Sequence, residues 1–415
     1  MRALLFAIGL SFSLQPLYAA KKVELGIDRL FQEHEALVKG KKIGLITNHT
    51  GVTSDLKWDI DLFREKEKSL GLTLKALFAP EHGLFGEGYA GQELAPLSYF
   101  EKIPVYGLWG QTRRPTKKMV EGIDLLVFDI QDIGCRSYTF QTTLFYVMEE
   151  AAKAKIGVIV CDRPNPINGE MVDGPMLENE WRSFVGYINV PYCHGMTIGE
   201  LAKFFNEEYK VGCDLTVIPM KGWKRSMTFA DTGLTWIPTS PNIPTAETAY
   251  FYPMTGLLGE FSFVSIGIGY TLPFRVVAAP WIDAKVLTDA LKATKMPGLS
   301  CTETHIKPYF GSFKGKICHG TLLSVADNKA FLPVTTQFLI MSVLKNLYPK
   351  ECQEVAKETA PKKDLFFKVC GTKAIYDLML VEKPRLVQFC MIGAKEKEEF
   401  LQKRKKYLEP AYEAF

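Results

Sequence analysis

Four apolar runs of this sequence are each followed directly by acidic, imidazole, amide or guanidinium side chains. Carboxyl and imidazole groups carry out general acid–base chemistry, and guanidinium groups bind anions in a bidentate manner. The groups are Asn48 and His49, Glu81 and His82, Asp129, Gln131 and Asp132, and Asp162, Arg163 and Asn165. If the runs are parallel strands, their carboxyl ends meet at one edge of a sheet, so we expect these groups to share a site.

Glu81 is the candidate for a catalytic acid. It stands between Pro80 and His82, and glycines follow at positions 83, 86 and 88, which allows its loop to shift. Partial burial favours the protonated form of a carboxyl group, as a proton donor requires. The alternative is that Glu81 only caps the turn before Gly83 and that His82 is a structural hydrogen-bonding residue.

Asp129, Asp132 and Asp162 are the candidates for a second catalytic carboxylate. Either of the first two could instead cap the following helix, and Asp162 could simply pair with Arg163. The guanidinium groups of Arg136 and Arg163 could bind an anionic group of a substrate. Equally, each could neutralise a neighbouring aspartate.

No standard motif for a metal or a nucleotide accompanies these residues. The sequence has no GxxxxGK[ST] loop, no GxSxG elbow and no HExxH pair. Glu81, His82, Asp129 and His194 could ligate a metal ion, but their spacing is not diagnostic. We therefore expect neither a metal ion nor a cofactor.

The elements that position these groups follow from periodicity. Residues 42–48, 72–78, 124–128 and 157–161 are near-continuous apolar runs, typical of strands buried on both faces of a parallel sheet. Amphipathic patterns between them predict helices over 55–70, 138–155 and 197–209, the last with a capping box of Thr197 and Glu200. Further strands are expected over 214–220 and 264–268. This alternation predicts an α/β fold with a Rossmann-like, doubly wound parallel sheet.

The second half of the chain has a different character. Residues 235–255 are rich in Pro, Thr and aromatic residues, which suits a long functional loop. Helices are expected over 284–295 and 334–347. We predict a catalytic domain over 23–280 and a smaller α+β domain over 281–415 that closes a cleft.

Composition excludes several classes of protein. The chain has 415 residues, 47% of them hydrophobic and 23% charged, with a net charge of +4 that is spread along the sequence. Nucleic-acid binding is not expected, because it requires a concentrated basic surface. The nine cysteines form no CxxC pair, which favours buried thiols over a zinc site or a disulfide framework. Composition does not determine an oligomeric state.

The first twenty residues resemble a signal peptide. Arg2 precedes an apolar run over 3–14, and the small residues Ala19 and Ala20 offer a cleavage site. The alternative is a buried N-terminal helix. No later run approaches the length of a membrane span. We expect an exported protein, periplasmic or held at the cell envelope.

Seven ordered motifs resemble one known family. They are GLITNHTG (44–51), FAPEHGLFG (78–86), GQTRRPT (110–116), FDIQDIGCRSYTF (128–140), DRPNPING (162–169), HGMTIGELA (194–202) and WIPTSPNIPT (236–245). Together they are similar to the bacterial exo-β-N-acetylmuramidases, a glycoside hydrolase family formerly described as a domain of unknown function. The resemblance extends from about residue 23 to the C-terminus.

The resemblance implies a Rossmann-like domain, a cleft between two parts, and no nucleotide cofactor. It implies release of N-acetylmuramic acid from the non-reducing end of peptidoglycan fragments. Glu81 would be the catalytic acid, and an aspartate from 129, 132 or 162 would be the second carboxylate. Alternatively, the substrate's own acetamido group would replace this second carboxylate. Many members read AGE where this chain has Ala90, Gly91 and Gln92. Residues expected to line the cleft are Asn48, His82, Asp129, Asp132, Arg136, Tyr138, Asp162, Arg163, Asn165, Asn168, His194 and Asn242.

Two rival interpretations remain open at this point. One is a metal-dependent amidase or deacetylase that acts on cell-wall glycan. The other is a protein that binds the cell wall without catalysis. We expect an exo-acting glycoside hydrolase whose partners are peptidoglycan-derived saccharides.

Overall fold

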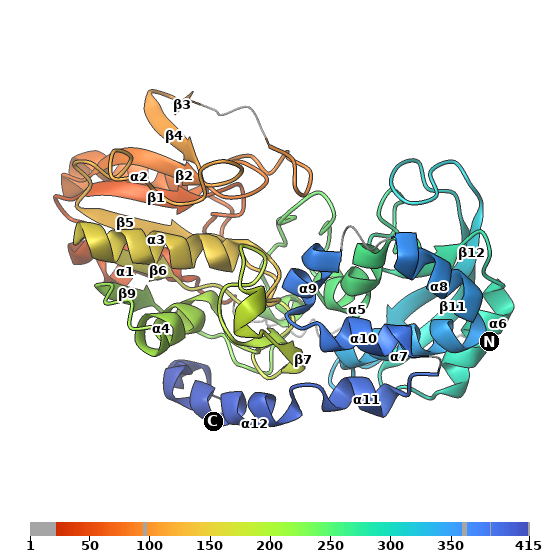
Figure 1. The fold of residues 1–415 in the computed structure, drawn as a ribbon. Coiled ribbons are helices and arrows are strands. Elements are labelled where there is room, and N and C mark those ends of the chain that lie inside the picture. The colour runs from red at the N-terminus through yellow and green to blue at the C-terminus, as the bar shows by residue number, and fades with distance from the viewer. Residues whose placement is uncertain (1–21, 94–97, 359–362, 382, 414–415) are drawn as a thin grey trace, which may run out of the picture.

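The computed structural model describes residues 22–93, 98–358, 363–381 and 383–413. The signal peptide expected over residues 1–20 lies outside these ranges. The chain forms two lobes, one built on a seven-stranded sheet and the other on a three-stranded sheet (Figure 1). A two-stranded ribbon, β7 and β8, is inserted in the sequence between β6 and β9 of the seven-stranded sheet.

The seven-stranded sheet has the strand order β3-β4-β2-β1-β5-β6-β9. All of its pairs are parallel except β3 with β4. The order reverses between β1 and β5, which makes the carboxyl ends of these two strands the topological switch point of a Rossmann-like sheet. The strands are β1 (Lys42–Thr47), β2 (Thr73–Ala79), β3 (Tyr99–Phe100), β4 (Ile103–Gly107), β5 (Leu125–Asp129), β6 (Gly157–Cys161) and β9 (Leu215–Ile218).

Helices cover both faces of this sheet, so the predicted doubly wound fold is confirmed. Leu45 of β1 packs in one apolar cluster with α1 and α2, and the next residue, Ile46, packs in the other with α3 and α4. Consecutive strand side chains point to opposite faces, so an uninterrupted apolar run serves both layers. The helices are α1 (Gly26–Glu33), α2 (Asp59–Leu70), α3 (Phe140–Ala154) and α4 (Ile198–Glu208).

The second lobe packs helices on an antiparallel sheet of order β10-β12-β11. Because β10 pairs with β12, this strand belongs to the second lobe; the domain boundary near residue 280 stays a prediction, and the pairing favours a position before β10. The elements are α5 (Thr248–Phe261), β10 (Val276–Ala279), α6 (Ala284–Ala293), β11 (Leu299–Ile306), β12 (Cys318–Val325), α7 (Pro333–Leu347), α8 (Pro349–Glu358), α9 (Lys363–Cys370), α10 (Ala374–Leu380), α11 (Leu386–Met391) and α12 (Ala394–Arg404).

Several connections tie the lobes together, among them a hydrogen-bonded carboxylate and the return of the chain. The carboxylate of Asp173, at the start of β7 (Asp173–Met176), accepts hydrogen bonds from the first turn of α7 at Val334 N (2.8 Å) and Thr335 N (2.9 Å). The chain after α11 then returns through α12 beneath the N-terminal lobe (Figure 1). There Tyr412 is fully buried against Trp223.

The observed elements agree with most of the sequence expectations. Thr197 caps α4, and the capping box with Glu200 is confirmed. The strand expected over 264–268 is wrong: only Ser265 forms an isolated bridge, with Ala278, because positive φ angles at Gly267 and Gly269 turn the chain away. Strand β4 was not expected from the sequence. Within the described ranges, every helix is too short or too polar to cross a membrane.

Candidate active site

Glu81 is held in a defined position just beyond the carboxyl end of β2. Its side chain is only 6% exposed. Oε2 accepts a hydrogen bond from the Thr139 hydroxyl (2.6 Å), and Oε1 accepts one from the Gly91 amide (2.9 Å). A threonine hydroxyl can donate or accept, so this contact is compatible with either protonation state of the carboxyl group. Glu81 is therefore fixed from two separate loops.

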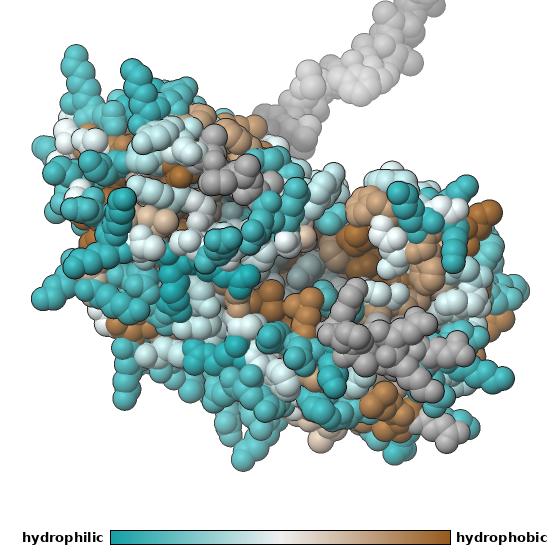
Figure 2. All heavy atoms as spheres, turned by 45° about the horizontal axis from the view of Figure 1, so that its top comes forward, coloured by the Kyte–Doolittle hydropathy of each residue, from teal (hydrophilic) through white to brown (hydrophobic). Residues whose placement is uncertain are grey.

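A cavity of about 330 Å³ lies at the junction of the lobes. Its volume lies at the lower end of the range of small-molecule sites, roughly 300–1,000 Å³. Figure 2 shows the surface hollowed between the lobes, with hydrophobic side chains on the walls of the hollow. The cavity is lined by Ala90, Tyr192, Asn242, Tyr252, Gly256, Gly259, Glu260, Val264, Ser265, Ile266, Ile268, Phe274, Gly311, Ser312 and Val369.

The cavity and Glu81 share supporting residues. Ala90 lines the cavity, and the next residue, Gly91, donates its amide hydrogen to Glu81. On the other side, the ring of Tyr252 lies edge-on to Tyr138 at 6.1 Å, and Tyr138 precedes the Thr139 that contacts Glu81. Glu81 is therefore connected to the wall of the cavity through the neighbours of Ala90 and Tyr138.

Asn242 and Tyr138 were expected in the cleft and belong to this region. Asn242 lines the cavity itself. Tyr138 donates its hydroxyl hydrogen to Thr239 Oγ1 (2.9 Å). This contact anchors the loop over 235–247 to the segment before α3, and burial raises the pKa of the Tyr138 hydroxyl.

Among the three candidate aspartates, Asp132 has an oxygen without a partner. Its Oδ2 accepts hydrogen bonds from Gly134 N (2.7 Å) and Gln141 Nε2 (2.9 Å), whereas Oδ1 is buried with no hydrogen-bond partner among the described residues. Burial raises the pKa of Asp132 to about 7, against the lowering effect of these two donors. A carboxyl group of this kind exchanges a proton near neutral pH.

Asp129 and Arg163 form a buried bidentate ion pair. Arg163 Nε lies 2.6 Å from Asp129 Oδ1, and Nη2 lies 2.7 Å from Oδ2. Arg163 Nη2 also donates to the carbonyl of Val52 (2.8 Å). Both side chains are therefore committed to each other, and Arg163 does not neutralise its sequence neighbour Asp162 through its side chain.

Asp59 extends this pair and was not singled out from the sequence. Its carboxyl group is fully buried, and Thr47 donates a hydroxyl hydrogen to it (2.5 Å). Burial, and then the negative charge of Asp129, raise the pKa of Asp59 well above its ordinary value. This contact could not be predicted from the sequence, because Asp59 begins α2 and acidic residues are common in a first helical turn.

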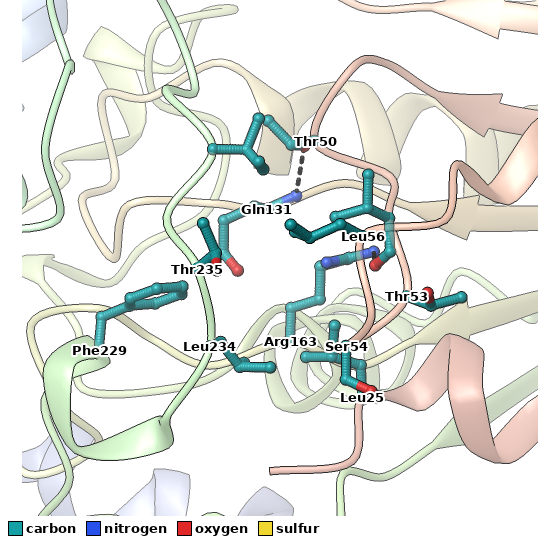
Figure 3. Close-up of a pocket in the computed structure, with 12 residues that line it drawn as sticks. Leu25, Thr50, Thr53, Ser54, Leu56, Gln131, Arg163, Phe229, Leu234 and Thr235 are labelled. Carbon is teal, nitrogen blue, oxygen red and sulfur yellow. Dashed lines mark hydrogen bonds between the residues drawn. The ribbon is translucent and has the colours of Figure 1, made fainter. Parts of the chain in front are cut away.

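A second, much smaller cavity lies at the switch point itself. Figure 3 shows Arg163 and Gln131 between the loop after β1 and the segment over 229–237. The backbone amide of Gln131 donates a hydrogen bond to the Thr50 hydroxyl (3.0 Å). The cavity measures about 20 Å³, which suits a single water molecule rather than a sugar. The usual binding position of this fold is thus filled by protein, and the larger space lies at the lobe junction.

Asp162 supports the fold rather than the cavity. Its two oxygens accept hydrogen bonds from Thr197 Oγ1 (2.7 Å), Gly199 N (2.8 Å), Tyr412 OH (2.7 Å) and Arg163 N (3.0 Å). Burial nevertheless raises its pKa to about 6. With four donors, this carboxyl group holds the start of α4 against the C-terminal segment.

His194 and Arg136 are both buried and contact other protein groups. Burial, followed by the charges of Arg404 and Arg136, lowers the pKa of His194 to about 3, so the ring stays neutral. Arg136 donates to four carbonyl groups, among them Val190 (2.7 Å) and Cys370 (2.5 Å), and so joins α9 to the N-terminal lobe. It pairs with no aspartate, contrary to one of the two sequence alternatives.

The remaining predicted residues shape backbone turns. His82 donates Nδ1–H to the carbonyl of Gly88 (2.7 Å) and has a φ of 72°. Asn165 and Asn168 accept hydrogen bonds from amides two or three residues further on, and Asn48 does the same for Thr50. These contacts set the loop paths around the site.

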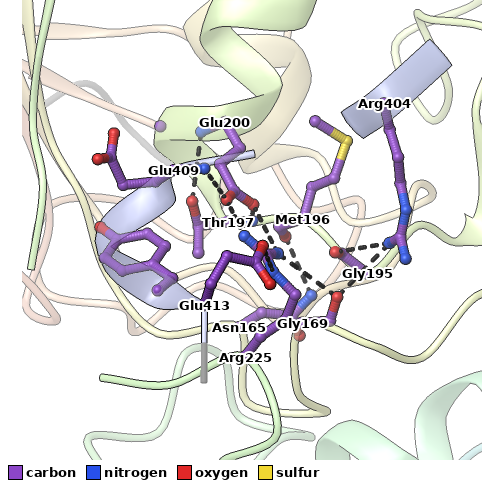
Figure 4. A network of polar contacts seen from close by, with 12 residues as sticks. Asn165, Gly169, Gly195, Met196, Thr197, Glu200, Arg225, Arg404, Glu409 and Glu413 are labelled. Atoms are coloured by element: carbon purple, nitrogen blue, oxygen red, sulfur yellow. Dashed lines mark hydrogen bonds and ion pairs between the residues drawn. The ribbon is translucent and has the colours of Figure 1, made fainter. Parts of the chain in front are cut away.

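A polar network close to these turns holds the C-terminal segment in place. Arg225 lies between Glu200 and Glu413, and Arg404 donates to the carbonyls of His194 and Gly195 (Figure 4). Arg225 Nη2 lies 2.5 Å from Glu200 Oε1. These ion pairs and hydrogen bonds therefore hold the loop before α4 in place.

Some features of the site escaped the sequence interpretation. Thr139, Tyr192 and Glu260 reach the site, yet a single Thr, Tyr or Glu carries no functional signal by itself. Residues 86–91 (GEGYAG) do have the GxGxxG spacing of dinucleotide-binding loops. Among the described residues, the next element after them is β3 and not a helix, so the helix N-terminus that binds a pyrophosphate is not seen in the described part of this segment. Among the described residues, no three His, Cys, Asp or Glu side chains gather as a metal site would require.

Comparison with known proteins agrees with this architecture. A crystal structure of a DUF1343 family protein from Bacteroides fragilis NCTC 9343 superposes with a TM-score of 0.86 at 37% identity, covering 93% of this chain and 98% of that one. A second DUF1343 structure from the same organism gives a TM-score of 0.73 at 27% identity, covering 95% and 100%.

The sequence comparisons carry a functional description. The peptidoglycan beta-N-acetylmuramidase NamZ of Bacillus subtilis (strain 168) is 43% identical over 333 residues, which is 80% of this chain and 79% of that protein. Residues 43–247 match the family described as exo-beta-N-acetylmuramidase NamZ, N-terminal, and residues 250–409 match its C-terminal counterpart. The chain therefore belongs to the exo-β-N-acetylmuramidase NamZ family.

Proposed function

We propose that this chain is an exo-acting glycoside hydrolase that releases N-acetylmuramic acid from the non-reducing end of peptidoglycan fragments. Family membership supports the reaction class. The observation that carries the assignment to this site is the buried carboxyl group of Glu81, which is connected through Gly91 to the wall of a cavity of about 330 Å³. A cavity at the lower end of the usual range suits one terminal sugar residue rather than a long glycan segment.

In this proposal Glu81 donates a proton to the oxygen of the scissile glycosidic bond. Protonation of the leaving oxygen lets the bond break through an oxocarbenium-like transition state. The hydrogen bonds from Thr139 and Gly91 hold the carboxyl group in one orientation, so little reorganisation is needed when the proton moves.

Asp132 is the second carboxylate in this proposal. Asp129 is engaged by Arg163, and Asp162 accepts four hydrogen bonds, whereas Asp132 keeps one oxygen free of any described partner. A free oxygen can accept a proton from water or orient the substrate's acetamido group. These are the roles of the second carboxylate in direct and in substrate-assisted glycoside cleavage, respectively.

The test is hydrolysis of a chromogenic β-N-acetylmuramide beside the matching β-N-acetylglucosaminide. We expect release from the muramide alone, because only that sugar carries the lactyl carboxylate. Glu81→Gln should lower kcat about 10²–10⁴-fold, the usual contribution of a general acid, while the unfolding temperature stays the same.

Glu87→Gln is the matched control for this variant. Glu87 is an exposed carboxylate on the same loop, so its loss should leave the rate unchanged. If the folded wild-type protein cleaves neither chromogenic substrate nor natural MurNAc-GlcNAc, the proposed function is wrong. If Glu81→Gln retains full activity, the role of Glu81 is wrong although the function stands.

We propose further that the chain is exported and cut after Ala20. The apolar run over 3–14 and the small residues before the cut support this. Val23, close to this site, is fully buried and donates its amide hydrogen to the carbonyl of Thr232 (3.0 Å), so a cut after Ala20 would leave this packed residue in the mature chain. N-terminal sequencing of protein from the producing cell tests this; a mature chain that retains residues 1–20 would contradict it.

A further inference from the structure

Cys135 and Cys193 face each other directly behind the candidate active site. They form an isolated antiparallel bridge that joins the loop before α3 to β8 (Pro191–Cys193). Both side chains are buried, with exposed fractions of 0% and 1%. Their sequence neighbours include Arg136 on one side and His194 on the other, so the bridge connects two segments of the site.

The bridge has the geometry in which opposed side chains come closest. Arg136 N donates to Tyr192 O at 2.8 Å, a bond between the residue after Cys135 and the residue before Cys193. This pattern identifies Cys135 and Cys193 as a non-hydrogen-bonded pair, whose Cα atoms are typically about 4.5 Å apart with side chains on the same face. Disulfides span Cα separations of about 4.4–6.8 Å, so this position lies within their range.

The side chains of Cys135 and Cys193 lie on the same face of the bridge. After burial, a hydrogen bond with Cys193 is the largest cause that raises the pKa of Cys135. Other cysteines on strands do not face a second cysteine: Cys301 lies opposite Leu323, and Cys318 lies opposite Ile306. Within the described part of the chain, which includes all nine cysteines, no second cysteine pair is matched across strands.

We propose that Cys135 and Cys193 form a disulfide when the chain folds in the presence of a small-molecule disulfide such as oxidised glutathione. One cysteine thiolate attacks a sulfur of the oxidant, forms a mixed disulfide and releases one glutathione thiolate. The second cysteine loses its proton, attacks the mixed disulfide and releases the other glutathione. The two protein thiols are oxidised, and one glutathione disulfide is reduced to two thiols that take up the two protons.

The disulfide would join the segment that holds Glu81 to the segment that begins α4. Thr139, which donates to Glu81, lies four residues after Cys135, and His194 follows Cys193 directly. A covalent link at this place limits how far the two segments separate when the lobes move. It also closes a long loop of the unfolded chain, which stabilises the folded state.

Burial sets the order in which oxidation happens. A thiol with no exposed surface is not reached by glutathione in the folded protein, whereas both thiols are accessible before folding. Oxidised glutathione present during refolding should therefore form the bond quickly. The same reagent added after reduced folding should form it only at the slow rate of local opening.

The experiment refolds the reduced full-length mature chain in a glutathione redox buffer, then alkylates all free thiols in denaturant. We expect alkylation of two fewer thiols than the nine cysteines, and a peptide map that links the peptides of Cys135 and Cys193. Cys135→Ala and Cys193→Ala should each lose the link. Cys213→Ala removes a buried cysteine elsewhere and should keep it.

The outcomes are independent of export and of muramidase activity, because neither is measured. Alkylation of all nine thiols in correctly refolded wild-type chain would overturn the proposal, as would a link between any other pair. A second readout is the unfolding temperature with and without reductant. Oxidised wild-type and Cys213→Ala chains should unfold several degrees higher than when reduced, and Cys193→Ala should show no such difference.

Discussion

At the scale of single residues, the site depends on how each carboxyl group is partnered. Glu81 contacts one hydroxyl and one amide, Asp129 is ion-paired, and Asp132 has one oxygen without a described partner. These differences separate three acidic side chains that look alike in the sequence. They assign distinct chemistry to each because hydrogen bonds and ion pairs decide which oxygen can exchange a proton.

Thr139 is predicted to position Glu81 for proton transfer. Thr139→Val keeps the shape of the side chain but removes the hydrogen bond of 2.6 Å, so we expect kcat to fall about tenfold with KM nearly unchanged. Thr139→Ser retains the hydroxyl group and should restore most of the rate. Equal losses in both variants would show that packing, and not the hydrogen bond, matters at this position.

Asp132 is predicted to make stability depend on pH. Its folded-state pKa of about 7 lies above the ordinary value of 3.8, so the folded state holds the proton more tightly than the unfolded chain does. Asp132 therefore contributes most to the free energy of unfolding below about pH 4, and this contribution is lost as the pH rises to about 7. The free energy of unfolding falls over this range by at most about 1.4 kcal/mol per pH unit. Asp132→Asn should remove this loss.

Urea unfolding at pH 4.5 and pH 7.5 measures this effect. The difference in stability between Asp132→Asn and wild type should shift in favour of the variant at the higher pH. Asp55→Asn, at a side chain that is 90% exposed, is the control and should show no such shift. A pH-independent difference for Asp132→Asn would contradict the prediction.

At the scale of elements, α4 begins where three distant segments meet. Thr197 caps the helix by accepting from Glu200 N (3.2 Å) and donates to Asp162 at the end of β6 (2.7 Å). Gly199 leaves no room for a side chain, since a Cβ there would lie 2.6 Å from Val217 and 2.8 Å from Asp162. The helix start is therefore determined by contacts with β6 as much as by its own capping box.

Thr197→Ala should destabilise the protein through this helix start. Loss of the cap costs about 1 kcal/mol, and loss of a donor to a buried carboxylate adds about 1–3 kcal/mol. Thr197→Ser keeps both hydrogen bonds and should stay within about 0.5 kcal/mol of wild type. Chemical denaturation of the two variants checks this; equal losses would mean that the methyl group is the important part.

At the scale of the whole molecule, the chain leaves the N-terminal lobe, builds the second lobe and returns. Tyr412 completes this return by donating to Asp162 (2.7 Å), accepting from Met220 N (2.8 Å) and packing edge-on against Trp223 at 4.9 Å. Arg136 makes a second connection through the carbonyl of Cys370. The orientation of the lobes, and with it the cavity between them, thus depends on several separate contacts.

Tyr412→Ala should cost about 3–5 kcal/mol, because it removes a fully buried aromatic side chain. Tyr412→Phe should cost about 1–3 kcal/mol, since it leaves Asp162 and the Met220 amide with one partner fewer. Tyr309→Phe, at a tyrosine that is 60% exposed, is the control and should be neutral. The measurement is the free energy of unfolding; a neutral Tyr412→Ala would show that the C-terminal segment does not support the N-terminal lobe.

The sequence by itself determined the strands β1, β2, β5 and β6 and the helices between them. The strands are near-continuous apolar runs and the helices repeat their apolar residues about every 3.6 positions, and both are local patterns that can be seen in the sequence directly. It also placed Glu81 at the end of a strand, and the ordered motifs identified the family. The expected strand over 264–268 failed because the turns at Gly267 and Gly269 interrupt an apolar run that otherwise resembles β-structure.

The tertiary structure alone decided which polar groups face a ligand. Asp162 is hydrogen-bonded to Tyr412, which lies 250 positions away in the sequence. Arg136 and its partner Cys370 are 234 positions apart, and Asp129 and its partner Arg163 are 34 positions apart. No local pattern specifies such partners, because they depend on how the packed elements bring distant segments together. The same packing fills the switch point of the sheet and leaves the larger cavity at the lobe junction, where Asn242 lines it.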